Sequence, residues 1–187
     1  MTKEYVKKSH IASWPENDVY FSTGISALAR KVTNSHSGSD YLFINLNSYT
    51  LKLFFRSFSQ LSKSGYQLII ISTQRLMPLA FFWHLKCHAV SAIFESRCSV
   101  HDVIRGLDTV ATGRQIVWSF PGPACLLSSR DVLLLRHYLE GGSMGYLQEK
   151  HCRAYSTLQG WKTTVARKFK VRKLEHLLIS NLSLIHI

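Results

Sequence analysis

Basic residues crowd one stretch near the end of the chain, where their chemistry suits a polyanion. No Asp or Glu stands between Glu149 and Glu175. Neutralising phosphates with Lys or Arg releases condensed counterions, so a stretch with charge of one sign favours binding to a polyanion. A basic balance alone could mean DNA, RNA, an anionic membrane or only solubility. The formal net charge of +12 is shared equally by residues 1–126 and 127–187, although the second part is half as long. The basic residues are Lys150, Arg153, Lys162, Arg167, Lys168, Lys170, Arg172 and Lys173.

Patterns for metal binding and catalysis are weak. At helical spacing His84, Cys87 and His88 share one face, but no fourth ligand follows at a regular distance, so we interpret them as structural. The Gly141-Gly142 pair has neither the lysine nor the spacing of a phosphate-binding loop. The 11 acidic residues include no pair placed for acid–base catalysis. We therefore expect no catalytic residue, no metal, no cofactor and no enzymatic activity.

The sequence favours a cytoplasmic protein without a membrane segment. The N-terminus carries charge with no apolar run behind it, unlike an export signal. The longest apolar run, around residues 79–83, is far shorter than the ~18 residues needed to span a bilayer. The cysteines have irregular spacing, which suits reduced thiols better than a disulfide framework. They are Cys87, Cys98, Cys125 and Cys152.

The last third of the chain has the pattern of consecutive short helices. Ser128 is a good N-cap with Asp131 three residues on, and Gly141 supplies a stop. Ser143 can cap a second, short helix. We predict that these two helices bury Val132, Leu135, Tyr138, Leu139, Met144 and Leu147.

A third helix follows a turn over residues 151–154 and could read DNA. It begins near Tyr155 or Ser156, and an apolar stripe from Leu158 to Phe169 recurs at i, i+3, i+7 and i+11. The opposite face carries short or amide side chains for base edges and cations for phosphates. A basic amphipathic helix on the outside of an ordinary bundle is the alternative. We predict base-edge contacts for Gln159, Gly160 and Thr163, and phosphate contacts for Ser156, Thr157, Lys162, Arg167 and Lys168.

Ahead of this part, short apolar runs alternate with helical patterns. The strand candidates are residues 11–14, 41–46, 68–72 and 89–94. The helical patterns are residues 24–31, 49–61 and 100–112. The two strongest runs, YLFINL and LIIIS, lack period-2 alternation, as do strands buried on both faces of a parallel sheet. This alternation predicts a doubly wound α/β domain over residues 8–119, a linker over 120–126 and an all-α domain over 127–178.

The aromatic patch at Phe81, Phe82 and Trp83 has two interpretations. It can belong to the core of the α/β domain. It can also be partly exposed and form a subunit contact, because aromatic residues are enriched in the cores of interfaces. Dimerisation is physically attractive, since helix-turn-helix proteins usually read paired half-sites.

Four short motifs in the C-terminal part fall at a fixed spacing without a gap. They are Leu127-Ser128-Ser129-Arg130-Asp131, Gly141-Gly142-Ser143, Thr157-Leu158-Gln159-Gly160-Trp161 and Lys168-Phe169-Lys170-Val171. With these motifs, residues 127–173 resemble the LuxR/NarL-type helix-turn-helix. The resemblance implies a transcriptional regulator that binds double-stranded promoter DNA. The sequence departs from the family at Gln148, at residues 151–153 and at Ala154. Polar groups at turn positions that normally pack inward cost stability, so we expect weak DNA binding without a partner.

The α/β part resembles the receiver domain that usually precedes this motif, with Val110-Ala111-Thr112-Gly113 as its closing sequence. The family's phosphorylation site would fall on Asn45, its acidic pair near Glu16 and Asn17, and its lysine on Glu95. The interval between residues 24 and 41 is too short for a complete second strand and helix. The resemblance therefore implies a degenerate receiver that is not phosphorylated.

Further short segments spread over most of the chain. They are Ser13-Trp14-Pro15, Val19-Tyr20-Phe21, Gly24-Ile25-Ser26, Phe43-Ile44-Asn45-Leu46-Asn47 and Phe82-Trp83. In these the chain resembles the EcpR/MatA fimbrial regulators and, more distantly, RcsA and RmpA. The resemblance implies control of fimbrial or other surface-structure genes by a homodimer, or by a heterodimer with a related regulator. The alternative is an interaction protein that acts through heterodimerisation, with weak or no DNA binding of its own. An RNA- or membrane-associated basic protein is a third interpretation.

Overall fold

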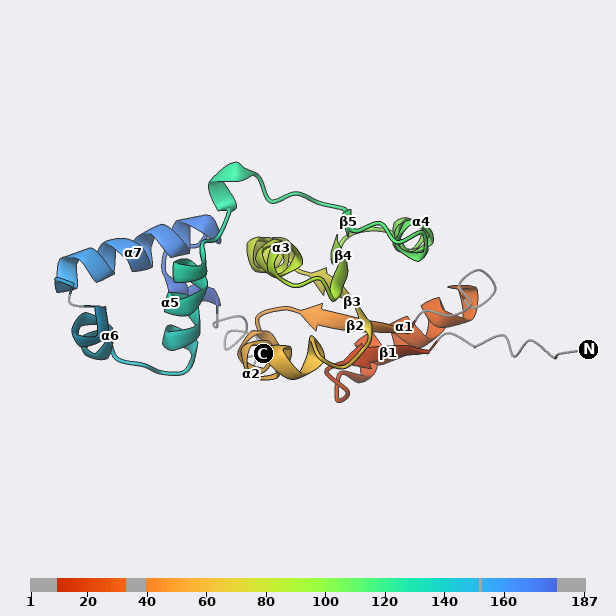
Figure 1. The fold of residues 1–187 in the computed structure, drawn as a ribbon, viewed down its shortest axis with the longest axis horizontal. Helices are drawn as coiled ribbons and strands as arrows, with labels where there is room; N and C mark the ends of the chain where they lie inside the picture. The colour runs from red at the N-terminus through yellow and green to blue at the C-terminus, as the bar shows by residue number, and fades with distance from the viewer. Residues whose placement is uncertain (1–9, 33–39, 152, 178–187) are drawn as a thin grey trace, which may run out of the picture.

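A computed structural model describes residues 10–32, 40–151 and 153–177. Its N-terminal α/β part alternates strands with helices, and its C-terminal part is helical (Figure 1). The strands are β1 (Ile11–Trp14), β2 (Tyr41–Leu46), β3 (Gln67–Ser72), β4 (Val90–Glu95) and β5 (Ile116–Val117). The α/β helices are α1 (Val19–Val32), α2 (Leu51–Leu61), the 3-10 turn η1 (Gln74–Leu76), α3 (Met77–Lys86) and α4 (Val100–Ala111). The helical part comprises η2 (Pro123–Cys125), α5 (Ser129–Leu139), α6 (Met144–His151), α7 (Tyr155–Lys168) and η3 (Leu174–Leu177).

The five strands form one parallel sheet in the order β1-β2-β3-β4-β5. A receiver-type sheet has the order 2-1-3-4-5, in which the second strand forms an edge. Among the described residues, α1 leads to β2 without such a strand, which confirms that this interval is too short for one. Within the described residues the sheet is therefore receiver-like but without that edge strand, and β5 extends its opposite edge.

Helices cover both faces of the sheet, as the doubly wound prediction requires. β2 is almost wholly buried because its side chains alternate between two cores. Ile44 and Leu46 pack in the core that contains α2 and α3, whereas Tyr41 and Phe43 pack with α1 and α4. Since α1 and α2 cover opposite faces while both connections step the same way across the sheet, the two crossovers have opposite hands. The reason is the edge strand to which the first helix of a receiver leads, which is not among the described elements. α1 covers the same face as in a receiver but connects to β2, on the other side of β1.

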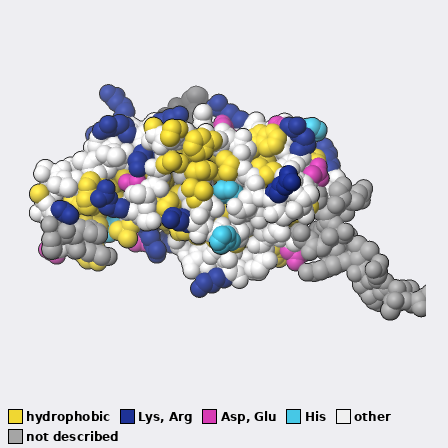
Figure 2. Space-filling view, turned by 45° about the horizontal axis from the view of Figure 1, so that its top comes forward, with side chains coloured by type: hydrophobic (Ala, Val, Ile, Leu, Met, Phe, Trp, Pro, Cys, Tyr) yellow, Lys and Arg dark blue, Asp and Glu magenta, His cyan; other side chains and the backbone are white. Residues whose placement is uncertain are grey.

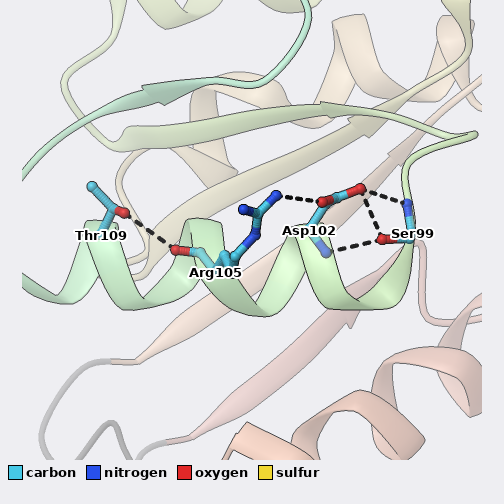
Figure 3. Close-up of polar contacts among 4 residues, drawn as sticks. All are labelled: Ser99, Asp102, Arg105 and Thr109. Carbon is cyan, nitrogen blue, oxygen red and sulfur yellow. Dashed lines mark hydrogen bonds and ion pairs between the residues drawn. The ribbon is translucent and has the colours of Figure 1, made fainter.

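The starts of α4 and α5 are fixed by the same device. Ser99 caps α4 by accepting a hydrogen bond from the amide of Asp102, whose carboxylate in turn accepts from the Ser99 amide. Arg105 lies one turn on and pairs with Asp102 at 2.7 Å (Figure 3). Ser128 and Asp131 form the equivalent capping box on α5, which confirms the predicted cap.

The helical part packs against the α2 and α3 side of the α/β part (Figure 1). The Phe120 ring of the linker lies 5.1 Å from that of Phe81, and Cys125 of η2 is buried. Arg75 after β3 donates a hydrogen bond to the His176 carbonyl of η3 at 3.4 Å. One apolar cluster therefore runs from the sheet into the helical part.

Several predicted boundaries are corrected by the structure. The first helix begins at Val19 instead of residue 24. The sequence pattern does not reveal its first turn, because that turn is largely exposed and lacks an apolar stripe. The second begins at residue 51, after Asn47 binds the Tyr49 and Thr50 amides through its side-chain oxygen. The remaining ends shift by one residue, to 67 for β3, to 90–95 for β4 and to 111 for α4.

The histidine and cysteine prediction is also corrected. His84 lies on α3, but the helix ends at Lys86, so Cys87 and His88 do not share its face. Burial lowers the pKa of His84, and its Nδ1 lies 3.1 Å from the Val90 carbonyl oxygen. In the described parts of the chain, no three His, Cys, Asp or Glu side chains are grouped to hold a metal.

The aromatic patch belongs mainly to the core. Phe82 is buried, whereas Phe81 and Trp83 are half-buried. The Trp83 ring lies 4.2 Å from the Phe58 ring of α2, centre to centre. Within the part of the chain that the structure covers, no helix is both long and apolar enough to cross a membrane.

Candidate nucleic-acid interface

The third helix of the C-terminal part is α7, and it begins at Tyr155, one of the two starts that the sequence allows. Its N-cap is Ala154, which has no side chain to cap the helix. The carbonyl of Ala154 instead accepts hydrogen bonds from the amides of Thr157 and Leu158 at 3.0 and 3.3 Å. Other amides of the first turn stay open to external acceptors, because the first amides of a helix have no partner within it.

The back of α7 is buried as predicted. Leu158, Val165 and Phe169 are at most 1% exposed. Trp161 is half-buried, and its ring lies beneath the guanidinium of Arg130 on α5, at 4.3 Å. This packing fixes the rotation of α7 and therefore decides which side chains face solvent.

Short side chains line the outer face of α7. Thr163 donates from Oγ1 to the Gln159 carbonyl at 3.0 Å, which ties its hydroxyl to the helix backbone. Gln159 is half-buried and donates from Nε2 to the Tyr155 hydroxyl at 2.7 Å, which holds the amide along the helix. The exposed members of the predicted DNA set are Ser156, Thr157, Gly160, Thr163 and Arg167.

The two predicted lysines are engaged inside the helical part. Lys162 lies 2.6 Å from an oxygen of Glu175 in η3, with its Nζ 4.7 Å from the centre of the Tyr138 ring. Lys168 lies 2.7 Å from Oδ2 of Asp131, the carboxylate that also closes the α5 capping box. The phosphate contacts of these lysines remain a prediction. A phosphate would have to compete with the carboxylate that each lysine already contacts.

The electrostatics of the Lys162 pair are strong. The hydrogen bond from Lys162 lowers the pKa of Glu175 from 4.5 to about 2. Burial, with the adjacent Glu175 carboxylate, raises the pKa of Tyr138 to about 12. At neutral pH Glu175 is therefore a carboxylate and Tyr138 a neutral phenol. No local pattern in the sequence predicts these partners, because Glu175 and Lys162 are 13 residues apart and Asp131 and Lys168 are 37 apart.

Other basic side chains, outside these pairs, flank the two ends of α7. Arg153, Lys170, Arg172 and Lys173 are exposed. Lys170 adopts a left-handed φ of 55°, and the amide of Val171 beyond it closes the helix on the Ala166 carbonyl at 3.0 Å. Figure 2 shows that Lys and Arg side chains outnumber Asp and Glu on the face drawn.

The element before α7 matches the prediction where it is described. Ser143 accepts a hydrogen bond from the Tyr146 amide at 3.2 Å, and Leu147 is 2% exposed. His137 stacks on Tyr146 and bonds through Nε2 to the Ser143 carbonyl at 3.0 Å. The predicted burial of Met144 and the side chain of His151 lie outside the described residues. The contact of α6 with α7 gives the two-helix arrangement that a helix-turn-helix requires.

The position that corresponds to the phosphorylation site is occupied by a hydrogen-bonded amide. Nδ2 of Asn45, near the end of β2, donates to Oδ2 of Asp18 at 2.8 Å. The resemblance to a receiver predicts the facing acidic pair near Glu16 and Asn17. The structure corrects this to Asp18, whose other oxygen caps α1 by accepting from the Phe21 amide. Glu95, at the position expected for the lysine, accepts a 3.5 Å hydrogen bond from Ser119.

The chain is similar to a protein family, to a protein of Salmonella typhi and to solved structures. Residues 1–111 match the family described as the EcpR N-terminal domain. The Vi polysaccharide biosynthesis protein TviA of Salmonella typhi is 33% identical over 166 residues, which are 89% of this chain and 93% of that protein. A structure of two RcsB dimers bound to two parallel DNAs is similar over 92% of this chain and 96% of that chain, with 15% identity and a TM-score of 0.49. An RcsB–DNA complex has the same coverage, 16% identity and a TM-score of 0.44.

Proposed function

The chain belongs to the family of the EcpR N-terminal domain, and we propose that it is a DNA-binding transcriptional regulator of genes for a surface structure. The observation that carries the proposal is the two-sided α7. An apolar back, from Leu158 to Phe169, is buried, while the exposed front combines short polar side chains with Arg167. A helix that enters the major groove needs this division, with cations at its margin for phosphates.

The proposed base-edge residues remain Gln159, Gly160 and Thr163. The proposed phosphate contacts are Ser156, Thr157, Lys162, Arg167 and Lys168. Of these, Ser156 and Thr157 lie in the first turn, where open backbone amides add to the attraction for a phosphate. Arg167 is exposed and lies near the other end of the helix, so the two groups can contact separate phosphates.

The target genes are proposed from the family and the relative. The family's domain is named for EcpR, and the relative is named for the biosynthesis of a surface polysaccharide. We propose control of fimbrial or polysaccharide genes by a cytoplasmic dimer without enzymatic activity. Phosphorylation does not switch it, because the amide of Asn45 cannot form an acyl phosphate.

A second candidate is a regulator that works through a heterodimer and binds DNA weakly alone. The ion pairs that Lys162 and Lys168 each form with a carboxylate of this chain favour it, because each lysine must leave its carboxylate to contact a phosphate. Binding of promoter DNA with and without a related regulator separates the two candidates.

The direct test compares Arg167→Ala with Arg114→Ala, in which an exposed arginine is removed ahead of β5. Loss of one phosphate contact should weaken binding for all DNA sequences and lower the salt slope by roughly one unit. Arg114→Ala should change neither quantity. Equal behaviour of the two variants would contradict the placement of α7 on DNA.

A further inference from the structure

A depression lies where three strands of the sheet end, beside η3. Its polar lining comes from the loops that follow β2, β3 and β4, and Leu177 of η3 closes one side. The polar residues are Ser48, Thr73, Gln74, Arg75, Ser96 and Arg97. In open α/β sheets, ligands bind outside the carboxyl ends of the strands, so this is the part of the fold where a ligand is expected.

The lining has the chemistry of an anion site. It combines two guanidinium groups with hydroxyl and amide donors, and none of its described residues carries a carboxylate. Arginine presents N–H groups in a planar fork that matches phosphate oxygens, and hydroxyl donors complete such sites. The nearest acidic residue in sequence, Glu95, accepts a hydrogen bond from the hydroxyl of Ser119, just ahead of the linker.

The two arginines have donors to spare. Arg97 is exposed and makes no hydrogen bond or ion pair within the described residues. Arg75 makes one long hydrogen bond, of 3.4 Å, to the His176 carbonyl. The hydroxyl of Thr73, which is half-buried, also has no bonded partner in the described parts of the chain. An anion could therefore bind without breaking an existing ion pair.

We propose that this depression binds a phosphate group, either the free ion or a small phosphomonoester, through Arg75 and Arg97. A receiver carries its phosphoryl group covalently on a carboxylate at this edge, whereas here the edge would hold phosphate by ionic hydrogen bonds. The proposal concerns the α/β part and η3, and it does not depend on DNA binding.

The site is connected to α7 through three consecutive residues. Leu177 lines the depression, the His176 carbonyl accepts from Arg75, and Glu175 holds Lys162 on α7. A phosphate that draws Arg75 away from His176 would loosen η3 where it restrains Lys162. Occupancy would then alter the availability of that lysine to DNA.

Calorimetric titration of the full chain, without DNA, tests the site with inorganic phosphate and with glycerol phosphate as separate probes. Saturable binding of either supports the site, and the tighter probe identifies the free ion or the ester as its ligand. Arg97→Ala should weaken binding roughly tenfold, and Arg97→Lys should weaken it less, because the charge remains and the fork is lost. Arg114→Ala is the matched control, since Arg114 precedes β5 at the opposite, amino edge of the sheet, and it should leave the affinity unchanged.

Three outcomes would overturn the proposal. The first is the absence of saturable binding to both probes. The second is equal binding by the wild type, Arg97→Ala and Arg75→Ala/Arg97→Ala proteins while their circular dichroism spectra remain native. The third is a lower salt slope for DNA binding in Arg97→Ala with phosphate affinity unchanged, which would assign Arg97 to the DNA backbone instead. Failure of the DNA assays alone would count against the proposed function. The phosphate titration would still decide whether the depression binds phosphate.

Discussion

Lys162 on α7 and Glu175 in η3 form an ion pair of 2.6 Å that joins the proposed DNA-reading helix to the segment after it. The lysine side chain is 21% exposed and the glutamate side chain 36% exposed, so the pair lies at the margin of solvent. If α7 binds DNA as proposed, the same lysine has two alternative anions, a carboxylate of its own chain and a DNA phosphate. This competition makes Glu175 a residue that can set the strength of DNA binding.

We predict that Glu175→Gln tightens DNA binding and raises the salt slope by roughly one unit, because the variant frees one cation for a phosphate. Binding measured over a series of salt concentrations checks this. Glu140→Gln is the matched control, since Glu140 pairs with Arg136 at 2.9 Å at the end of α5. Equal changes in both variants would mean that only net charge matters and that Lys162 does not reach DNA.

The same pair should contribute a pH-dependent part of the stability. The folded-state pKa of Glu175 is lowered from 4.5 to about 2, so its contribution is present above pH 4.5 and is lost as the pH falls toward 2. We predict that the wild type melts at a higher temperature than Glu175→Gln near neutral pH. The difference should shrink below about pH 4.5. A difference that stays constant as the pH falls would show that the carboxylate charge is not its source.

Two helical glycines should respond oppositely to alanine. A Cβ on Gly160 meets no atom within 4 Å, so Gly160→Ala should stabilise the protein by about 0.5–1 kcal/mol through helix propensity. A Cβ on Gly106 would lie 2.4 Å from Cζ of Phe94, so Gly106→Ala should destabilise it by about 1–3 kcal/mol. Urea unfolding checks both values. Gly160→Ala should also weaken specific DNA binding, because in the proposed complex the added methyl group would face the bases. An unchanged or higher affinity would remove Gly160 from the interface.

Acetyl phosphate with Mg²⁺ should add no phosphoryl group to the protein. The position of the acceptor is Asn45, whose amide is not a phosphoryl acceptor and is bonded to Asp18 at 2.8 Å. Intact-mass measurement after incubation checks this, with a phosphorylatable receiver in the same buffer as the positive control. One added phosphoryl group per chain, mapped to the α/β part, would refute the degenerate-receiver interpretation.

The sequence predicted local features well and long-range pairings poorly. YLFINL is the strand β2 with the predicted ends, because a short continuous apolar run between polar turns is typical of a strand buried on both faces. α7 begins at Tyr155, since the apolar stripe fixes its phase. The first turn of α1 has no such stripe, and its start was misplaced. The partners Glu175, Asp131 and Asp18 could not be predicted, because each faces a residue that only the tertiary fold brings near.

The most direct test of the central claim is the sequence preference of Gln159→Ala, measured by competition against DNA sites varied one base at a time. If α7 enters the major groove, this amide reads a base edge, and its loss should cost about 1–3 kcal/mol at the preferred site but little on non-specific DNA. The salt slope should stay nearly constant. Thr164→Ala, which removes an exposed hydroxyl that donates to the Gly160 carbonyl of the same helix, is the control and should keep the wild-type preference. A preference in Gln159→Ala that is unchanged at every base position would contradict the claim that this helix reads DNA.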